Sequence, residues 1–176
     1  SAALNFEYYC YFIIQAFNGA AISFIAQNYG AGLMQRVRRV FWICMVASVI
    51  FSGMMNAIFA CFSPFFLRIF SSSEAIIPYG VTRMHLVLAF QWIACSYEIS
   101  ASALRGMGRS LLPALLTVVG TCLLRMVWVF AVCPVWPGFH RLMLVYPLSW
   151  VLTGAMVVVA YVRFMKKAGD APLAVR

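Results

Sequence analysis

Five long apolar runs dominate this chain, and each is long enough to cross a lipid bilayer. A helix needs roughly 20 apolar residues to span a hydrocarbon core of about 30 Å. The runs cover approximately residues 4–27, 40–62, 79–104, 111–133 and 142–163. Only 10% of the residues are charged, whereas a soluble domain carries roughly 25% to cover its surface. The sequence therefore predicts an all-α, polytopic membrane bundle of five transmembrane helices, with the lipid bilayer as its solvent.

The basic residues lie in the connections between these runs, and their distribution predicts an orientation. One side of the predicted membrane receives nine basic residues: Arg36, Arg38, Arg39, Arg105, Arg109, Arg163, Lys166, Lys167 and Arg176. The other side receives Arg68 and Arg141, joined by Arg83 if that residue lies at the outer edge of its span. Basic connections stay in the cytoplasm, so we expect the chain to start outside and to end inside. We expect a multi-pass protein of the plasma membrane, with residues 168–176 as a flexible cytoplasmic tail.

The net charge of +9 is explained by this orientation, and we expect no nucleic-acid partner. The chain starts at Ser1 without a basic stretch before its first apolar run. We therefore expect it to be a piece of a longer protein and not to carry a signal peptide.

Two of the predicted cytoplasmic connections combine glycines with arginines. Glycine and asparagine end helices because they tolerate the left-handed conformation, and arginines attract anionic cytoplasmic lipid. We assign the cytoplasmic turns to Gln27, Asn28, Gly30, Gly32, Arg105 and Gly106. The first of these turns is hypothesised to act as a pivot when the bundle bends.

Polar residues recur at helical spacing inside the apolar runs, which indicates a protein interior or a watery cavity. The first run carries Glu7, Tyr11, Gln15 and Asn18 on one face, at intervals of three or four residues. The third run carries Gln91 and Glu98, and the fourth carries Thr117, Thr121 and Arg125.

The ionisable residues within the predicted spans leave two interpretations open. Each charge costs roughly 2.5–3.5 kcal/mol at mid-membrane on the insertion scale. Glu7 and Glu98 therefore either belong to structural ion pairs or remain protonated, or they bind a proton or a metal cation in a cavity. Arg125 is predicted to be a fixed countercharge, but its partner is left open. One residue adds about 1.5 Å along a helix, which places Arg125 on the order of 12 Å further out than Glu98.

No catalytic constellation or cofactor-binding motif can be assembled from this sequence. The six cysteines lie within or at the ends of apolar runs without a CxxC pair, which is typical of small core residues. We therefore expect a protein that is not an enzyme and that has no catalytic residue, metal ligand or cofactor.

Several motifs resemble those of the multidrug and toxic compound extrusion (MATE) transporters. "FIAQNYGAGLMQRVRR" is similar to the family's turn into a cytoplasmic loop, and "RIFSSSEAIIPYG" to the stretch before the fourth helix of a half. "EISASALRGMGRSLLPALL" resembles the alanine-leucine-arginine-glycine turn, and "YPLSWVLTG" resembles the last helix of the C-terminal half. The resemblance extends from Asn5 to Lys167 and agrees with the predicted topology.

This resemblance implies a transporter of twelve helices in two bundles around a central cavity. The five spans would be helices eight to twelve, so that the first helix of this bundle and the entire N-terminal bundle are missing. It also implies export of cationic or amphipathic small molecules, coupled to H⁺ or Na⁺, which this piece alone is not expected to perform. Glu98 and Glu7 are the candidates for cation coupling, although the family often carries an aspartate where this sequence has Glu98. The candidates for the cavity lining are Gln15, Asn18, Gln91 and Tyr11.

Two alternatives remain open at this point. Flippases for lipid-linked saccharides share the overall architecture, but they line their cavity with several basic residues, whereas this half offers Arg125. The other alternative is a membrane scaffold or remnant that transports nothing.

Overall fold

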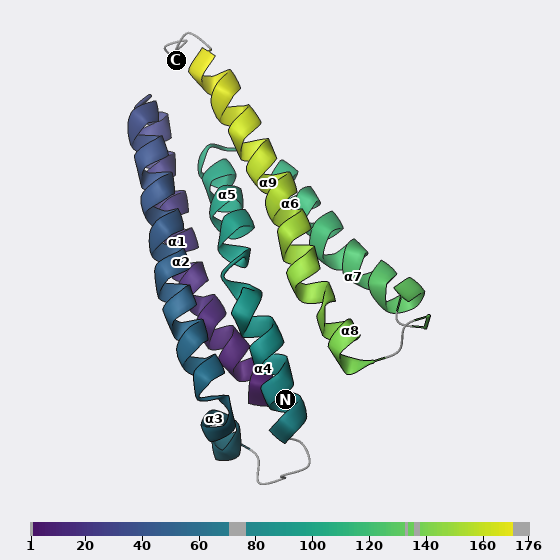
Figure 1. Ribbon diagram of the computed structural model, residues 1–176. Helices are drawn as coiled ribbons and strands as arrows, with labels where there is room; N and C mark the ends of the chain where they lie inside the picture. Colours follow the sequence, from purple (N-terminus) through teal and green to yellow (C-terminus); the bar gives the residue numbers. More distant parts are fainter. Residues whose placement is uncertain (1, 71–76, 133, 136–137, 171–176) are drawn as a thin grey trace.

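The computed structural model describes residues 2–70, 77–132, 134–135 and 138–170, and within them every regular element is helical. The chain runs through α1 (Ala2–Gly30), α2 (Met34–Cys61), α3 (Ser63–Phe70), α4 (Ile77–Gln91), α5 (Ala94–Gly106), α6 (Leu111–Thr117), the π-helix η1 (Val118–Leu123), α7 (Leu124–Val127), the π-helix η2 (Trp128–Val132), α8 (Phe139–Met143) and α9 (Val145–Asp170). The start of α1 and the end of α9 lie at opposite ends of the bundle (Figure 1).

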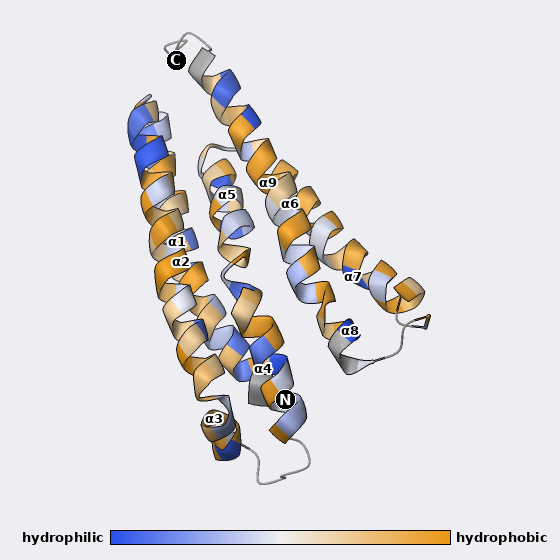
Figure 2. Cartoon of the chain, viewed as in Figure 1, coloured by the Kyte–Doolittle hydropathy of each residue, from blue (hydrophilic) through white to orange (hydrophobic). Residues whose placement is uncertain are grey.

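Four stretches are long and apolar enough to cross a membrane, and α4 with α5 forms a fifth if the bent pair counts as one span. Large apolar side chains such as Phe12, Trp42 and Phe130 are more than half exposed on the outside of the bundle. In Figure 2, most of the helical ribbon has the colours of apolar residues. Such a surface requires lipid as its solvent, which confirms the predicted all-α membrane bundle.

The third predicted span is not one continuous helix. Residues 77–91 and 94–106 form two helices that meet at 46°. At the break, the amides of Ile93 and Cys95 donate to carbonyls three residues back, Phe90 O at 3.0 Å and Trp92 O at 3.1 Å. The Trp92 indole NH donates to Ala89 O at 2.9 Å. The break contains neither proline nor glycine, so nothing in the local sequence predicted it.

The fourth span is also irregular, because α-helical and π-helical segments alternate from Leu111 to Val132. Gly120 in η1 faces α9, and an added Cβ there would collide with the Thr153 hydroxyl. The absence of a side chain therefore lets η1 and α9 approach closely in the middle of the bundle.

Both glycine-containing turns end their helices in the same way. After α1, Leu33 N donates to Asn28 O at 2.8 Å and Gly32 N to Tyr29 O at 3.0 Å. After α5, Arg109 N donates to Leu104 O at 2.8 Å and Gly108 N to Arg105 O at 3.0 Å. This pair of bonds is the Schellman motif, whose C′ residue is left-handed.

The left-handed residues of these motifs are Gly32 (φ 74°) and Gly108 (φ 78°). Gly30 and Gly106, which are also predicted to belong to the turns, are the last residues of α1 and α5. Gly106 has a packing reason, because a Cβ there would lie 2.9 Å from the backbone oxygen of Ile22 on α1.

The bundle has its core between α1, α2, α5 and α9. Helix α1 packs most extensively against α2 and α5, and α5 in turn against α9. Cys10, Cys44 and Cys95 are buried, whereas Cys61 and Cys122 are exposed, and all five have free thiols. Cys133 lies outside the described residues. Helix α9 extends to Asp170, so part of the expected flexible tail is helical, and residues 171–176 lie outside the described part.

Candidate functional site

The first polar cluster centres on the Glu98 carboxylate between α5 and α1. The Tyr11 hydroxyl donates to Glu98 Oε1 at 2.7 Å, and Asn18 Nδ2 donates to Glu98 Oε2 at 2.8 Å. Glu98 is 8% exposed and Asn18 is 3% exposed. Both partners are neutral, so the two carboxylate oxygens are hydrogen-bonded without being charge-compensated.

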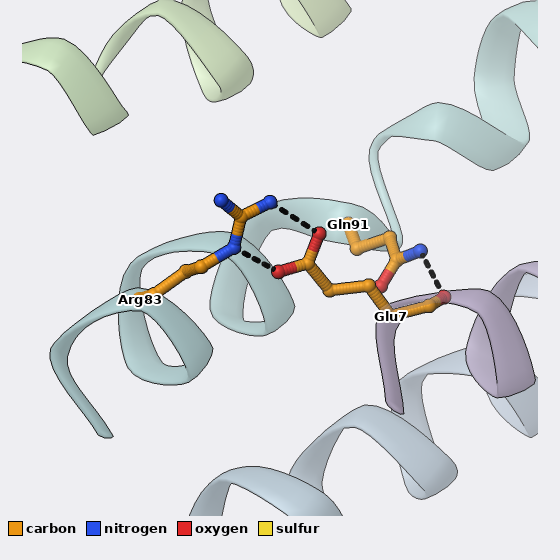
Figure 3. A network of polar contacts seen from close by, with 3 residues as sticks. All are labelled: Glu7, Arg83 and Gln91. Carbon is orange, nitrogen blue, oxygen red and sulfur yellow. Dashed lines mark hydrogen bonds and ion pairs between the residues drawn. The ribbon is translucent and has the colours of Figure 1, made fainter. Parts of the chain in front are cut away.

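The second polar cluster centres on Glu7 and differs in its electrostatics. Arg83 on α4 donates from Nε to Glu7 Oε1 at 2.6 Å and from Nη2 to Glu7 Oε2 at 3.0 Å. Gln91 Nε2 donates to the Glu7 backbone carbonyl at 3.0 Å, so α4 forms hydrogen bonds with both the side chain and the backbone of Glu7 (Figure 3). A bidentate guanidinium–carboxylate pair compensates the charge of Glu7 directly.

Both carboxylates border one cavity of about 410 Å³. Its wall contains Glu7, Tyr11, Gln91 and Glu98, as well as residues from the fourth and fifth spans. The latter are Thr117, Thr121, Arg125, Tyr146 and Trp150. The polar stripe expected on the fourth span therefore faces this cavity with three of its residues.

Arg125 lies in the cavity wall and forms its contacts with neutral groups. Its guanidinium lies 4.6 Å from the centre of the Tyr146 ring, and its Nε donates to Ser149 Oγ at 3.1 Å. Arg83 lies 5.6 Å from the same ring centre. Among the described residues, the counterion of Glu7 is thus Arg83, and Arg125 pairs with neither Glu7 nor Glu98.

Two of the residues expected to line the cavity lie outside its wall. Asn18 is buried and hydrogen-bonded to Glu98, while Gln15 is exposed and its Oε1 accepts a long hydrogen bond of 3.4 Å from Asn18 Nδ2. The polar face of α1 therefore lies partly in the cavity wall, with Glu7 and Tyr11, and partly at the interface with α5, with Asn18.

The residues assigned to the cytoplasmic turns do not contribute to the wall of this cavity. Asn28 Nδ2 donates to Phe24 O at 2.8 Å and thus caps the last turn of its own helix. Gln27 and Arg105 are exposed.

Sequence reasoning missed Arg83 and Tyr146 as members of this site. Arg83 lies within the third predicted span, 76 residues from Glu7. The predicted orientation of the chain treats it as a basic residue at the outer edge of the membrane and not as a partner of Glu7. The signal in the sequence is the position of Arg83 inside the predicted span 79–104, where a charged side chain needs a partner.

The comparisons with known proteins agree with this architecture. Residues 1–130 match the sequence family MatE, which is nearly three quarters of the chain. The chain belongs to the MatE family. Members of this family are transporters, which confirms the resemblance carried by the sequence motifs. None of the curated proteins compared with the chain gives a significant match.

The part that matches MatE contains both polar clusters. Glu7, Tyr11, Asn18, Arg83 and Glu98 all lie within residues 1–130. Tyr146 and Trp150 complete the cavity from α9, beyond the matched region. Among the described residues, one wall of the cavity thus combines Glu7, which is paired with Arg83, and Glu98, which has no counterion there.

Proposed function

We propose that this chain is part of a cation-coupled antiporter of the MATE type, in which Glu98 is the coupling carboxylate. In this proposal the exported compounds are cationic or amphipathic, and the coupling ion is H⁺ or Na⁺. The protein works in the plasma membrane with the start of the chain outside and its end in the cytoplasm. The further helices expected from the family complete the transport cavity.

The contrast between the two carboxylates carries this proposal. Glu7 already has a cation in bidentate contact, whereas Glu98 accepts hydrogen bonds from two neutral groups, Tyr11 and Asn18, and has no cation in contact among the described residues. A charge within the membrane costs roughly 2.5–3.5 kcal/mol on the insertion scale. Binding of a proton, Na⁺ or a cationic compound removes part of this cost at Glu98. At Glu7 the same binding would lower the free energy little, because Arg83 already compensates its charge.

Competition for Glu98 couples the opposing fluxes. A carboxylate that holds a proton or Na⁺ no longer attracts a cationic compound, so that ion and compound occupy the cavity alternately. Alternate occupancy produces antiport only if each bound state also favours a different opening of the cavity. Glu98 connects to such an equilibrium through its hydrogen bonds, because they join α5 to α1.

Asn18 is suited to both protonation states of Glu98. In the structure its Nδ2 donates to the carboxylate, and its Oδ1 is buried without a hydrogen-bond partner. A protonated carboxyl group needs an acceptor for its own proton. A half-turn of the Asn18 amide exchanges its NH₂ group for Oδ1 at the same place, so that the contact survives proton uptake.

The test is transport of ethidium by proteoliposomes that contain the full-length protein to which this bundle belongs. Export is driven by an imposed pH or Na⁺ gradient, and Glu98→Gln is compared with wild type at matched protein levels. We expect wild type to export ethidium under one of the gradients and Glu98→Gln to lose gradient-driven export.

Gln91→Leu is the control variant, because Gln91 lies in the same wall but carries no charge. It should retain the gradient dependence even if its rate changes. Export that persists in Glu98→Gln contradicts the coupling role of Glu98. Absence of export in wild type under both gradients contradicts an H⁺- or Na⁺-driven exporter of ethidium.

A further inference from the structure

A second cavity lies between α6 and α9, away from the polar clusters. It has a volume of about 680 Å³, and its walls are apolar over most of their length, with Leu112 and Leu116 on α6 and Met156 and Val159 on α9. Three basic residues complete its lining: Arg163, Lys166 and Lys167. We call this cavity the α6–α9 groove.

The apolar and basic residues of α9 follow one another along a single helix face. Met156, Val159, Arg163 and Lys166 are separated by three, four and three residues, which is the spacing of one face. The face therefore changes from apolar to basic toward the end of α9. The hydrophilic residues at that end of the helix are visible in Figure 2.

The dimensions of this face match one leaflet of a bilayer. From Met156 to Lys167 the helix advances by eleven residues, or about 16 Å at 1.5 Å per residue. Half of a hydrocarbon core of about 30 Å is about 15 Å. A lipid whose acyl chain lies against Met156 and Val159 would therefore have its headgroup beside Arg163, Lys166 and Lys167.

The described lining of the groove carries three basic residues and no acidic residue. The sequence contains four acidic residues. Glu7 and Glu98 border the polar cavity, and Asp170 is the last residue of α9, beyond Lys167, the last of the described lining residues. No ion pair of Arg163, Lys166 or Lys167 is found among the described residues. Arg109, 5.6 Å from the centre of the Phe164 ring, adds a fourth cation beside the groove.

We propose that the α6–α9 groove binds an anionic phospholipid, with its phosphate at Arg163, Lys166 and Lys167 and an acyl chain along the apolar wall. Basic pockets between transmembrane helices are suited to acidic headgroups. A free phosphate would leave the apolar wall uncovered, and an apolar helix in the groove would leave the three cations without an anion. An anionic phospholipid supplies an acyl chain for the apolar wall and a phosphate for the three cations.

The experiment measures lipid retention by the purified full chain. Wild type and variants are reconstituted in vesicles of phosphatidylcholine with a minority of phosphatidylglycerol, extracted in mild detergent, and analysed for bound lipid by native mass spectrometry. The groove variant is Arg163→Gln/Lys166→Gln/Lys167→Gln. The control variant is Arg36→Gln/Arg38→Gln/Arg39→Gln, which removes the same charge from the start of α2.

We expect the groove variant to retain phosphatidylglycerol on the order of tenfold less than wild type, because each basic residue near an anionic headgroup contributes to its attraction. The control variant should retain it nearly as wild type does. Equal loss in both variants overturns the proposal in favour of diffuse surface electrostatics. No loss in the groove variant overturns it as well, as expected if another helix of the complete protein fills the groove.

A second variant tests the apolar wall without changing charge. Val159→Trp narrows the groove, and Val159 is 46% exposed, so the larger side chain does not have to enter the core. It should lower phosphatidylglycerol retention severalfold while the helix content by circular dichroism stays unchanged. Full retention in this variant shows that no acyl chain lies in the groove.

Discussion

Arg83 on α4 and Glu7 on α1 form a bidentate ion pair, with Nε–Oε1 at 2.6 Å and Nη2–Oε2 at 3.0 Å. The two side chains are 16% and 11% exposed, so the pair is largely withdrawn from solvent. This pair ties two helices together at the border of the cavity and separates the role of Glu7 from that of Glu98.

The first prediction concerns the stability that depends on this ion pair. Arg83→Met or Glu7→Gln leaves one buried charge without its partner, which costs about 3–5 kcal/mol for a fully buried pair. We expect a loss toward the lower end, because both side chains keep some exposure. Unfolding in detergent by denaturant titration measures it.

The double variant Arg83→Met/Glu7→Gln is the control for this prediction. It removes both charges, so it should be more stable than either single variant. If the loss of stability in the double variant equals the sum of the losses in the two single variants, the two residues do not interact in solution.

The second prediction concerns Asn18 as the partner of Glu98. Asn18→Leu keeps the size of the side chain but removes its donor and its acceptor. A hydrogen bond to a charged group contributes roughly 1.5–3 kcal/mol, so gradient-driven transport by the full-length protein should fall by on the order of tenfold. Gln15→Leu should have little effect, because Gln15 is exposed and its bond to Asn18 is long. Equal effects of both variants would contradict a specific role of Asn18.

The third prediction distinguishes the two glycines of the first turn. Gly32 has a φ of 74°, so Gly32→Ala should destabilise the protein by about 1–2 kcal/mol. Gly30 is helical and has no atom near the place of an added Cβ. Gly30→Ala should therefore be neutral or slightly stabilising. Thermal unfolding in detergent compares the two, and a larger loss for Gly30→Ala would refute the Schellman assignment.

The fourth prediction concerns Asn56 on α2. It is 3% exposed, and neither atom of its amide has a hydrogen-bond partner. An unsatisfied buried polar group costs about 1–3 kcal/mol, so Asn56→Leu should raise the free energy of unfolding by about 1 kcal/mol. Asn18→Leu, which loses a real hydrogen bond, should lower it. A loss of stability in Asn56→Leu would show that ordered water satisfies the amide.

The long apolar runs and the turn glycines could be interpreted from sequence because their physics is local. Crossing a bilayer requires a fixed number of apolar residues, and a left-handed helix end favours glycine whatever surrounds it. The two turns still differed in detail from the expectation. Gly32 and Gly108 take the left-handed position, whereas Gly106 is small because α1 approaches it.

The candidate site could be predicted only in part. The helical spacing of Glu7 and Tyr11 on α1 indicated a polar face, and both border the cavity. The same spacing included Gln15 and Asn18, which lie outside its wall, because spacing specifies a face but not the direction in which that face points.

The sequence by itself determined the membrane environment, the family motifs and the presence of two carboxylates within the predicted spans. The tertiary structure decided that Glu7 pairs with Arg83, that Arg125 stacks on Tyr146, and that the partners of Glu98 within the described part of the chain are the neutral Tyr11 and Asn18. It also decided the bend between α4 and α5, which no proline or glycine marks. These features depend on the rotation and tilt of packed helices, and side chains 70 or more residues apart meet only after that packing is complete.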